Sequence, residues 1–276
     1  MASATPAPGG PAPRRTLVVG LAHPDDELGA AGAILAQRAR GDRVVIVWLT
    51  RGEMTEAFGP LPSDEVARRR TEQGHAAATI LGAEARFLDF PDTRVAATPE
   101  AAAEVARVLA ELRPDGLLTW GEGWTRGIRH PDHQAAGKIF RDALTLARIA
   151  KVVHPMPPHR ATVPVFTYRD VHSTLPAVAL DVAPYLEKIR ELADFYYRGI
   201  GFGDPAWFRA RLAANGAPWG LGFAEVFDAW ESEPGVVEAL LPAALPEGLL
   251  HPDRRAESSS AAAEDDSARR SGCSNP

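Results

Sequence analysis

The feature that most constrains the fold is a regular alternation of short apolar runs with longer helical patterns. Residues 16–22 (TLVVGLA) and 43–50 (RVVIVWLT) are continuous apolar runs, which is typical of strands buried on both faces of a sheet. Between them, the alanine-rich residues 27–40 predict a helix that ends at Gly41. Further elements are expected along the chain: strands at 85–90, 115–120, 164–168 and 177–182, and helices at 63–81, 98–112, 132–150 and 184–198.

This alternation predicts an α/β fold, a single Rossmann-like domain with a mostly parallel sheet and helices on both faces. Ser63 is the expected cap of the helix at 63–81, and Thr98 with Pro99 is the expected start of the next one. We expect the strand order 3-2-1-4-5, plus extra strands. Ligands bind such sheets beyond the carboxyl ends of the strands, where the strand order reverses. For this order, that point lies between the first and the fourth strand.

Length and composition set the outer limits. The 276 residues suffice for one large domain, which we expect at 16–245, with disordered tails at 1–15 and 246–276. A net charge of −6 argues against a nucleic-acid or membrane-surface partner. No apolar run is long enough to span a bilayer, and the Pro-rich start is no signal peptide, so a cytoplasmic location is expected. The single cysteine, Cys273, excludes a disulfide within the chain or a cysteine-based metal cage.

Two clusters of histidine and aspartate follow the two strands that should flank the ligand crevice. HPDDE (residues 23–27) comes after the first strand, and HPDH (residues 130–133) comes after a loop at the end of the fourth. Each motif alone is also compatible with a capped helix start, because aspartate is a good N-cap. Their joint occurrence after these two strands favours a site with chemistry.

Histidine and carboxylate side chains are ligands that suit zinc, and catalytic zinc takes three protein ligands. His23, Asp26 and His133 form such a set, which leaves Asp25 as a general base and His130 to face a reacting carbonyl. The same ligand set also accepts Fe²⁺, Co²⁺ or Mn²⁺, so the native metal stays open.

At this point the motifs resemble those of the PIG-L/LmbE-like family of zinc-dependent N-deacetylases. The resemblance rests on the two clusters, with support from Thr50-Arg51-Gly52-Glu53, from the Arg69 helix with its RxxE pattern, and from residues 222–227 (GFAEVF). It implies that His23, Asp26 and His133 bind zinc.

The resemblance also implies roles around the metal. Asp25 is then the general base, and His130, held in orientation by Asp132, stabilises the oxyanion or protonates the departing amine. Glu53 and Arg69 match positions near the sugar hydroxyls in sugar deacetylases of this family. For both residues a plain surface or loop role is the alternative.

The predicted function is therefore removal of an acetyl group from an N-acetylated amino sugar of the N-acetylglucosamine type, free or conjugated. An amidase that acts on a larger thiol or sugar conjugate is the alternative. It needs the same metal site but a wider entrance to that site, and the loops at 121–129 and 151–163 determine how wide the entrance is. A sugar-binding protein without catalysis is a third alternative, but it has no need for both Asp25 and His130. Apolar residues in 195–230 are numerous enough for a homo-oligomer interface.

Overall fold

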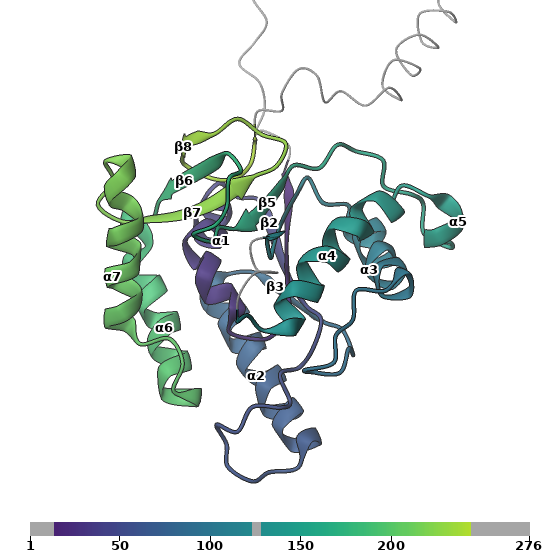
Figure 1. Cartoon of the computed structure of the whole chain (residues 1–276), viewed down its shortest axis with the longest axis horizontal. Coiled ribbons are helices and arrows are strands. Elements are labelled where there is room, and N and C mark those ends of the chain that lie inside the picture. Colours follow the sequence, from purple (N-terminus) through teal and green to yellow (C-terminus); the bar gives the residue numbers. More distant parts are fainter. Residues whose placement is uncertain (1–13, 123–127, 244–276) are drawn as a thin grey trace, which may run out of the picture.

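The protein is described here by a computed structural model that covers residues 14–122 and 128–243 (Figure 1). Apart from Arg14 and Arg15, the predicted tails at 1–15 and 246–276 lie outside the described residues. The strands are β1 (Thr16–Leu21), β2 (Arg43–Trp48), β3 (Glu84–Phe87), β4 (Gly116–Thr119), β5 (Val165–Tyr168), β6 (Ala177–Asp181), β7 (Ala224–Ala229) and β8 (Gly235–Val237).

Seven α-helices and three short 3-10 helices accompany the strands in the described part of the chain. The α-helices are α1 (Ala31–Ala39), α2 (Ser63–Leu81), α3 (Pro99–Leu112), α4 (Pro131–Leu146), α5 (Ala150–Val153), α6 (Leu186–Ile200) and α7 (Pro205–Gly216). The 3-10 helices are η1 (Asp26–Ala30), η3 (Ala183–Tyr185) and η4 (Ala217–Trp219). None of the described helices is long and apolar enough to cross a membrane.

The eight strands form one sheet in the order β3-β2-β1-β4-β5-β7-β6-β8. The predicted 3-2-1-4-5 order is confirmed, and these five strands run parallel. β1 is central, with Val18 opposite Val45 of β2 on one side and Leu117 of β4 on the other. Strands paired on both sides and covered on both faces must be apolar throughout, which explains why β1 and β2 are continuous hydrophobic runs.

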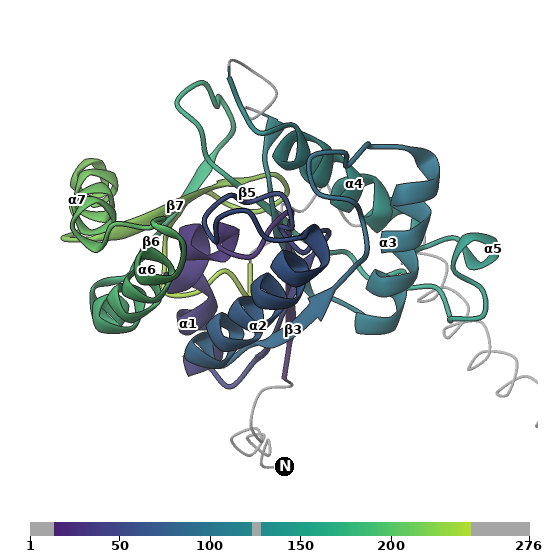
Figure 2. The same cartoon turned by 90° about the horizontal axis from the view of Figure 1, so that it is seen from below.

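Helices cover both faces of the sheet. Figure 2 shows α1, α2 and α6 on one side and α3 and α4 on the other. Thr98 caps α3 as predicted, because its side chain accepts a hydrogen bond from the backbone N–H of Ala101 at 3.2 Å. The prediction for Ser63 is wrong: Pro62 is the N-cap of α2, and it makes no side-chain capping bond.

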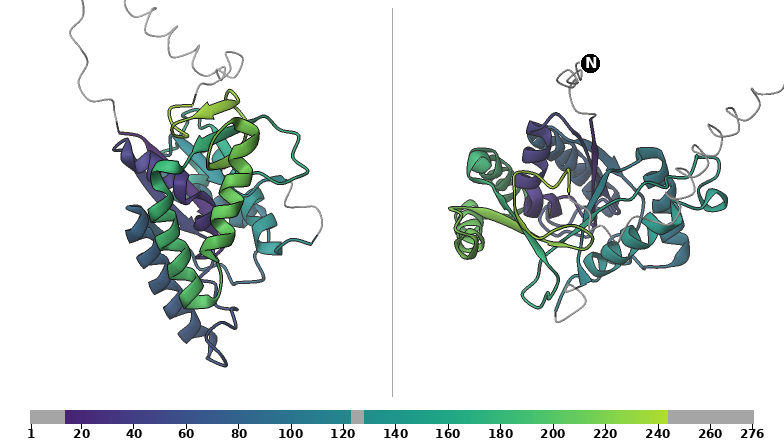
Figure 3. Two further views of the ribbon diagram at one scale, coloured as in Figure 1. Left: turned by 90° about the vertical axis from the view of Figure 1, so that its left-hand side faces the viewer. Right: turned by 90° about the horizontal axis from the view of Figure 1, so that it is seen from above.

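The structure differs from the sequence prediction in three places. The expected helix at 27–40 begins with the 3-10 turn η1, and the one at 132–150 is divided into α4 and α5. The third difference is the segment 205–237, where no elements were expected but α7, β7 and β8 form. β7 lies between β5 and β6 and is antiparallel to both, so this segment extends the sheet beyond β5. α7 runs beside α6 and contacts β7 (Figure 3).

Candidate metal-binding site

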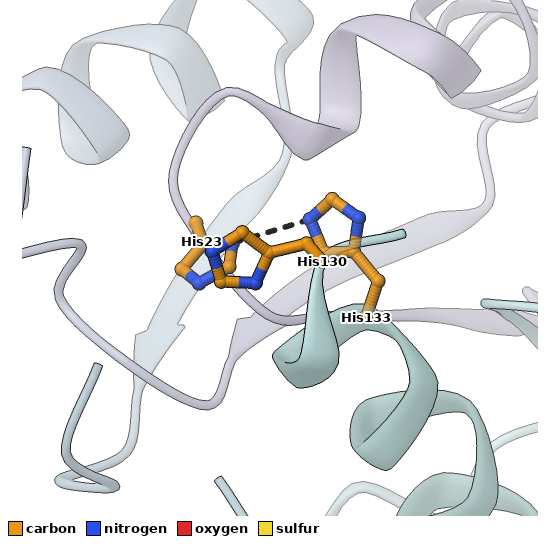
Figure 4. Close-up of side chains that lie close together, drawn as sticks. All are labelled: His23, His130 and His133. Atoms are coloured by element: carbon orange, nitrogen blue, oxygen red, sulfur yellow. Dashed lines mark hydrogen bonds between the residues drawn. The ribbon is translucent and has the colours of Figure 1, made fainter. Parts of the chain in front are cut away.

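Three histidine side chains meet where the carboxyl ends of β1 and β4 lie side by side. His23 follows β1, and His130 and His133 stand at the start of α4 (Figure 4). Nδ1 of His23 lies 3.3 Å from Nε2 of His133. The His23 and His130 rings meet edge to face with their centroids 4.6 Å apart. The predicted meeting of the two clusters at the strand-order reversal is therefore present.

Asp26 is held in place by the backbone around it. Its Oδ2 accepts hydrogen bonds from the backbone N–H groups of Ala22, at 3.0 Å, and His23, at 2.9 Å. This leaves Oδ1 directed at Nε2 of His133, 3.0 Å away. Burial opposes ionisation of this carboxyl, but the neighbouring His133 and His23 overcome it and hold the pKa of Asp26 well below its usual range. Asp26 is thus a fixed carboxylate.

These three side chains fit a zinc ion. Zinc–nitrogen bonds of about 2.0–2.1 Å place two ligands of a tetrahedral site about 3.3 Å apart. The two separations already described, 3.3 Å between the histidine nitrogens and 3.0 Å from His133 to Asp26, are close to that value. The donor set of two imidazoles and one carboxylate is also the type that catalytic zinc uses.

The other ring nitrogen of His23 faces the carboxylates of Asp92 and Asp132. Nε2 lies 3.1 Å from Oδ1 of Asp92 and 3.2 Å from Oδ2 of Asp132. Asp132 is completely buried and also accepts hydrogen bonds from the backbone N–H groups of Thr93, at 2.7 Å, and Val95, at 3.2 Å. Burial disfavours the imidazolium, but the carboxylates outweigh it and raise the pKa of His23 to about 10.

His23, Asp92 and Asp132 lie close enough to hold a metal by themselves, as do His23, His130 and His133. One ring cannot aim the same nitrogen at both groups. Because Nδ1 of His23 faces His133 and Nε2 faces the acids, the two carboxylates are better placed to orient the ring than to replace Asp26. Carboxylates that hold the far nitrogen of a ligating histidine are common around zinc.

The expected link between Asp132 and His130 takes a different form. His130 is the N-cap of α4, and its Nδ1 accepts the hydrogen bond of the Asp132 backbone N–H at 3.3 Å. The Asp132 carboxylate instead reaches back to His23, because the first turn of α4 directs it toward the end of β1. A neutral His130 ring that accepts at Nδ1 carries its proton on Nε2. Burial, with His23 and His133 close by, lowers the pKa of His130 and favours this neutral form.

Asp25 stands in a strained backbone conformation beside a buried arginine. Its φ angle is 106°, a region that residues other than glycine rarely adopt. The side chain makes no capping bond to η1; its Oδ2 accepts a hydrogen bond from Nη2 of Arg70 at 2.5 Å. Glu27 holds the other side of the turn by accepting the Asp25 N–H at 2.9 Å. The capped-turn alternative therefore does not account for Asp25.

The environment of Asp25 sets its proton affinity. Burial raises the pKa of Asp25 to about 6, with Asp26 adding to the rise and Arg70 opposing it. A carboxyl with a pKa near 6 is ionised at neutral pH and still basic enough to accept a proton from water during a reaction. Arg70 itself is only 2% exposed, so this ion pair is shielded from solvent.

The two predicted substrate contacts lie away from the site. Arg69 points outward, where its guanidinium pairs with Glu65 at 2.8 Å and lies over the ring of Phe58. Glu53 stands behind the loop and accepts the backbone N–H of Asp92 at 2.8 Å. Neither residue lines the cavity at the metal-binding site.

Two residues of the remaining loops also lie elsewhere. His159 is buried and contacts the carbonyl oxygen of Pro114 at 2.8 Å, which places it near the start of β4, at the opposite end of the sheet from the site. His172 is exposed and does not line the cavity. The central part of the 121–129 loop, residues 123–127, lies outside the described residues.

A cavity of about 520 Å³ opens over the metal-binding site. Its floor contains His23, Asp25, Asp26, His130 and His133. Its walls include side chains that belong to none of the predicted site motifs, among them Arg70, Trp120, Tyr168, Phe202, Phe208 and Arg211. Trp120 stacks on the His133 ring with centroids 3.9 Å apart and so fixes one wall against the floor.

Comparison with protein families matches residues 17–144 to the family described as PIG-L, GlcNAc-PI de-N-acetylase. The chain is 35% identical over 127 residues to a diacetylchitobiose deacetylase of Thermococcus kodakarensis, a match that covers 45% of this chain and 47% of that protein. It is 35% identical over 168 residues to the 1D-myo-inositol 2-acetamido-2-deoxy-alpha-D-glucopyranoside deacetylase of Kineococcus radiotolerans, covering 49% and 46%. The chain thus spans about half the length of these curated relatives.

Solved structures share the fold over a larger part of the chain. The conserved protein TT1542 of Thermus thermophilus is 29% identical, with a TM-score of 0.66 over 78% of this chain and 94% of that one. N,N'-diacetylchitobiose deacetylase of Pyrococcus horikoshii is 20% identical with a TM-score of 0.69, covering 78% and 84%. GalB of Pseudomonas putida, a 4-carboxy-2-hydroxymuconate hydratase, reaches 0.66 at 22% identity, covering 78% and 95%. One fold therefore carries different reactions, and the site must decide between them.

Proposed function

Because residues 17–144 match the PIG-L family, we propose that the chain is a zinc-dependent hydrolase that removes the acetyl group from an N-acetylated amino sugar of the N-acetylglucosamine type. The observation that carries this proposal is the convergence of three side chains, with His133 lying 3.3 Å from His23 and 3.0 Å from Asp26, and with Asp25 beside them in the same cavity. The named deacetylases among the relatives support this reaction over an amidase for larger conjugates.

In this proposal Nδ1 of His23, Oδ1 of Asp26 and Nε2 of His133 hold the metal. A bound zinc ion supplies a Lewis acid that polarises the amide carbonyl and makes water more acidic. Asp92 and Asp132 orient the His23 ring from behind through its Nε2. Fe²⁺, Co²⁺ and Mn²⁺ suit the same donors, so the identity of the native metal is part of what has to be tested.

The chain's own residues then move the protons. Asp25 accepts a proton from the attacking water, and its contact with Arg70 keeps its carboxylate fixed during the transfer. His130 donates a hydrogen bond from Nε2 to the oxygen that gains negative charge as the carbonyl becomes tetrahedral, and it keeps its proton. Asp25 can return its proton to the nitrogen of the sugar as the C–N bond breaks. The products are acetate and the free amino sugar.

The test is release of amine from a panel of N-acetylated sugars by the zinc-loaded protein. The panel contains N-acetylglucosamine, diacetylchitobiose and N-acetylglucosaminides with small aglycones, and Asp25→Ala serves as the control. Amine released by the parent but not by the variant supports deacetylation. Tight zinc binding without release from any sugar contradicts it, and a failure to bind zinc removes the basis of the whole site.

A further inference from the structure

The helix α7 presents one of its faces to the cavity above the metal-binding site. Phe208, Arg211 and Asn215 all line this cavity and are spaced three and four residues apart, so they lie on the same side of the helix. Figures 1 and 3 show α7 beside α6, outside the parallel part of the sheet. This wall is therefore built by the C-terminal segment and not by the part that carries the metal ligands.

Arg211 differs from the other two arginines that line the cavity. Arg70 is paired with Asp25, and Arg169 is paired with Asp228. Within residues 14–122 and 128–243, Arg211 has no carboxylate within 4.0 Å and no hydrogen bond from its guanidinium to the protein, and its Nε is buried without a partner.

The neighbours of Arg211 do not satisfy its N–H groups. Glu225 is near enough to act on its charge, but both oxygens of that carboxylate accept backbone N–H groups of α1, from Gly32 and Ala33, at 2.8 Å each. The guanidinium lies over the rings of Trp207 and Phe208, at 5.3 and 4.7 Å from their centroids. The aromatic rings stabilise the positive charge, but they do not accept hydrogen bonds from the N–H groups, which point outward in the plane of the guanidinium.

The Nε–H of Arg211 is buried without an acceptor, and an unpaired buried donor has a free energy cost that a bound anion removes. Its planar fork of donors matches the two oxygens of a carboxylate or of a phosphate. The rings of Phe202 and Phe208 in the same wall offer apolar surface next to it. The wall is therefore suited to a group that is negatively charged and has an apolar body.

We propose that the substrate of this site is an N-acetylated amino sugar whose aglycone carries a carboxylate or a phosphate, and that Arg211 binds this anion. The inference rests on the proposed deacetylase function and specifies its substrate class. Asn215, half-buried one turn further along α7, supplies a second polar group beside the anion. In this arrangement the acetamido group reaches the metal-binding site while the aglycone lies along α7.

The experiment compares three phenyl N-acetylglucosaminides that differ only at the para position, which is a carbamoyl, a carboxylate or a phosphate group. We expect zinc-loaded parent protein to show a kcat/KM about 10- to 100-fold higher for one of the anionic glycosides than for the carbamoyl glycoside, which is the range for a charge-assisted hydrogen bond. The anion with the larger preference identifies which of the two the site selects.

Arg211→Met is expected to lose this preference, so that its kcat/KM for the anionic glycosides falls to the level of the carbamoyl glycoside. Arg211→Lys should keep part of the preference, because it retains the charge without the fork. Arg209→Met is the matched control, since Arg209 is exposed on the same helix, lies over Phe223 and does not line the cavity. Each preference is a ratio within one variant, so a loss of folded protein cancels.

Three results overturn the inference. If the parent hydrolyses all three glycosides equally, or if Arg211→Met keeps the preference, then deacetylation stands and the anion site does not. If none of the three is hydrolysed while zinc is bound, the proposed function itself fails and the inference falls with it.

Discussion

Replacement of Asp132 by asparagine tests whether the buried carboxylate behind His23 tunes a metal ligand or only braces a loop. One carboxylate oxygen accepts from the Thr93 N–H at 2.7 Å and lies 3.2 Å from Nε2 of His23; the other accepts from the Val95 N–H at 3.2 Å. Asparagine keeps the shape but has only one acceptor oxygen. If that oxygen takes the place next to His23, its NH₂ group must face the N–H of Val95.

The structure gives two magnitudes for Asp132→Asn. One buried backbone N–H loses its acceptor, which costs about 1–3 kcal/mol of the free energy of unfolding. Loss of the negative charge makes the His23 ring a weaker ligand, and changes of this kind around a metal reduce affinity about 10- to 100-fold. That factor corresponds to about 1.4–2.8 kcal/mol of zinc binding energy.

Zinc affinity is measured by competition with a chromogenic chelator, and stability by chemical denaturation of the metal-free protein. Asp142→Asn is the matched control, because Asp142 lies on the same helix, has a side chain that is 45% exposed, and among the described residues pairs only with Lys138, at 2.6 Å. Such exposed pairs contribute about 0–1 kcal/mol. If Asp132→Asn loses stability but binds zinc as tightly as the parent, the carboxylate is a brace and the reasoning about His23 is refuted.

Three further predictions follow from single residues. Asp25→Asn should lower kcat at least about 100-fold with the zinc content unchanged, because the amide still accepts a hydrogen bond from Arg70 but cannot take a proton from water. A kcat near that of the parent would contradict the role of Asp25 as general base. Gly137→Ala should reduce the free energy of unfolding by about 1–3 kcal/mol, despite the higher helix propensity of alanine, because the added Cβ meets the Trp120 carbonyl oxygen at 2.4 Å; thermal denaturation checks this. Burial raises the pKa of Glu225 from 4.5 to about 7, so ionisation of this carboxyl is unfavourable in the folded state. The free energy of unfolding of the parent, relative to that of Glu225→Gln, should therefore fall by at most about 3 kcal/mol as the pH rises from about 4.5 to about 7. Denaturation at several pH values measures this slope.

The order of the five parallel strands and the location of the site follow from local pattern. Continuous apolar runs identify β1 and β2, and the reversal of strand order between β1 and β4 identifies the crevice. Because the two histidine and aspartate clusters begin where these strands end, their meeting is a consequence of topology and needs no knowledge of side-chain geometry. The assignment of His23, Asp26 and His133 as metal ligands stays a prediction for zinc measurements to decide.

Asp92 and Arg211 could not be selected in the same way. Asp92 follows β3, and only the path of its loop, fixed by the hydrogen bond that the Asp92 N–H donates to Glu53, brings it to His23. Arg211 lies on α7, a helix whose start is marked in the sequence by Asp204 followed by Pro205, an N-cap with proline at the first position. That signal identifies the helix, but no local pattern shows that β7 enters between β5 and β6 and brings α7 over the cavity.

Arg69 is a predicted substrate contact, whereas it is the neighbouring Arg70 that lines the cavity. This difference has another cause, because the sequence itself shows which of the two arginines is buried. The buried positions of α2 include Val66, Arg70, Gly74 and Ala78, a strict four-residue spacing along one stripe of the helix. Arg69 is rotated about 100° from that stripe and meets solvent and Glu65. An arginine at a position where the period of the helix demands an apolar residue must have a buried partner. Here the partner is Asp25, so the periodicity of α2 alone identifies which of the two neighbouring arginines reaches the site.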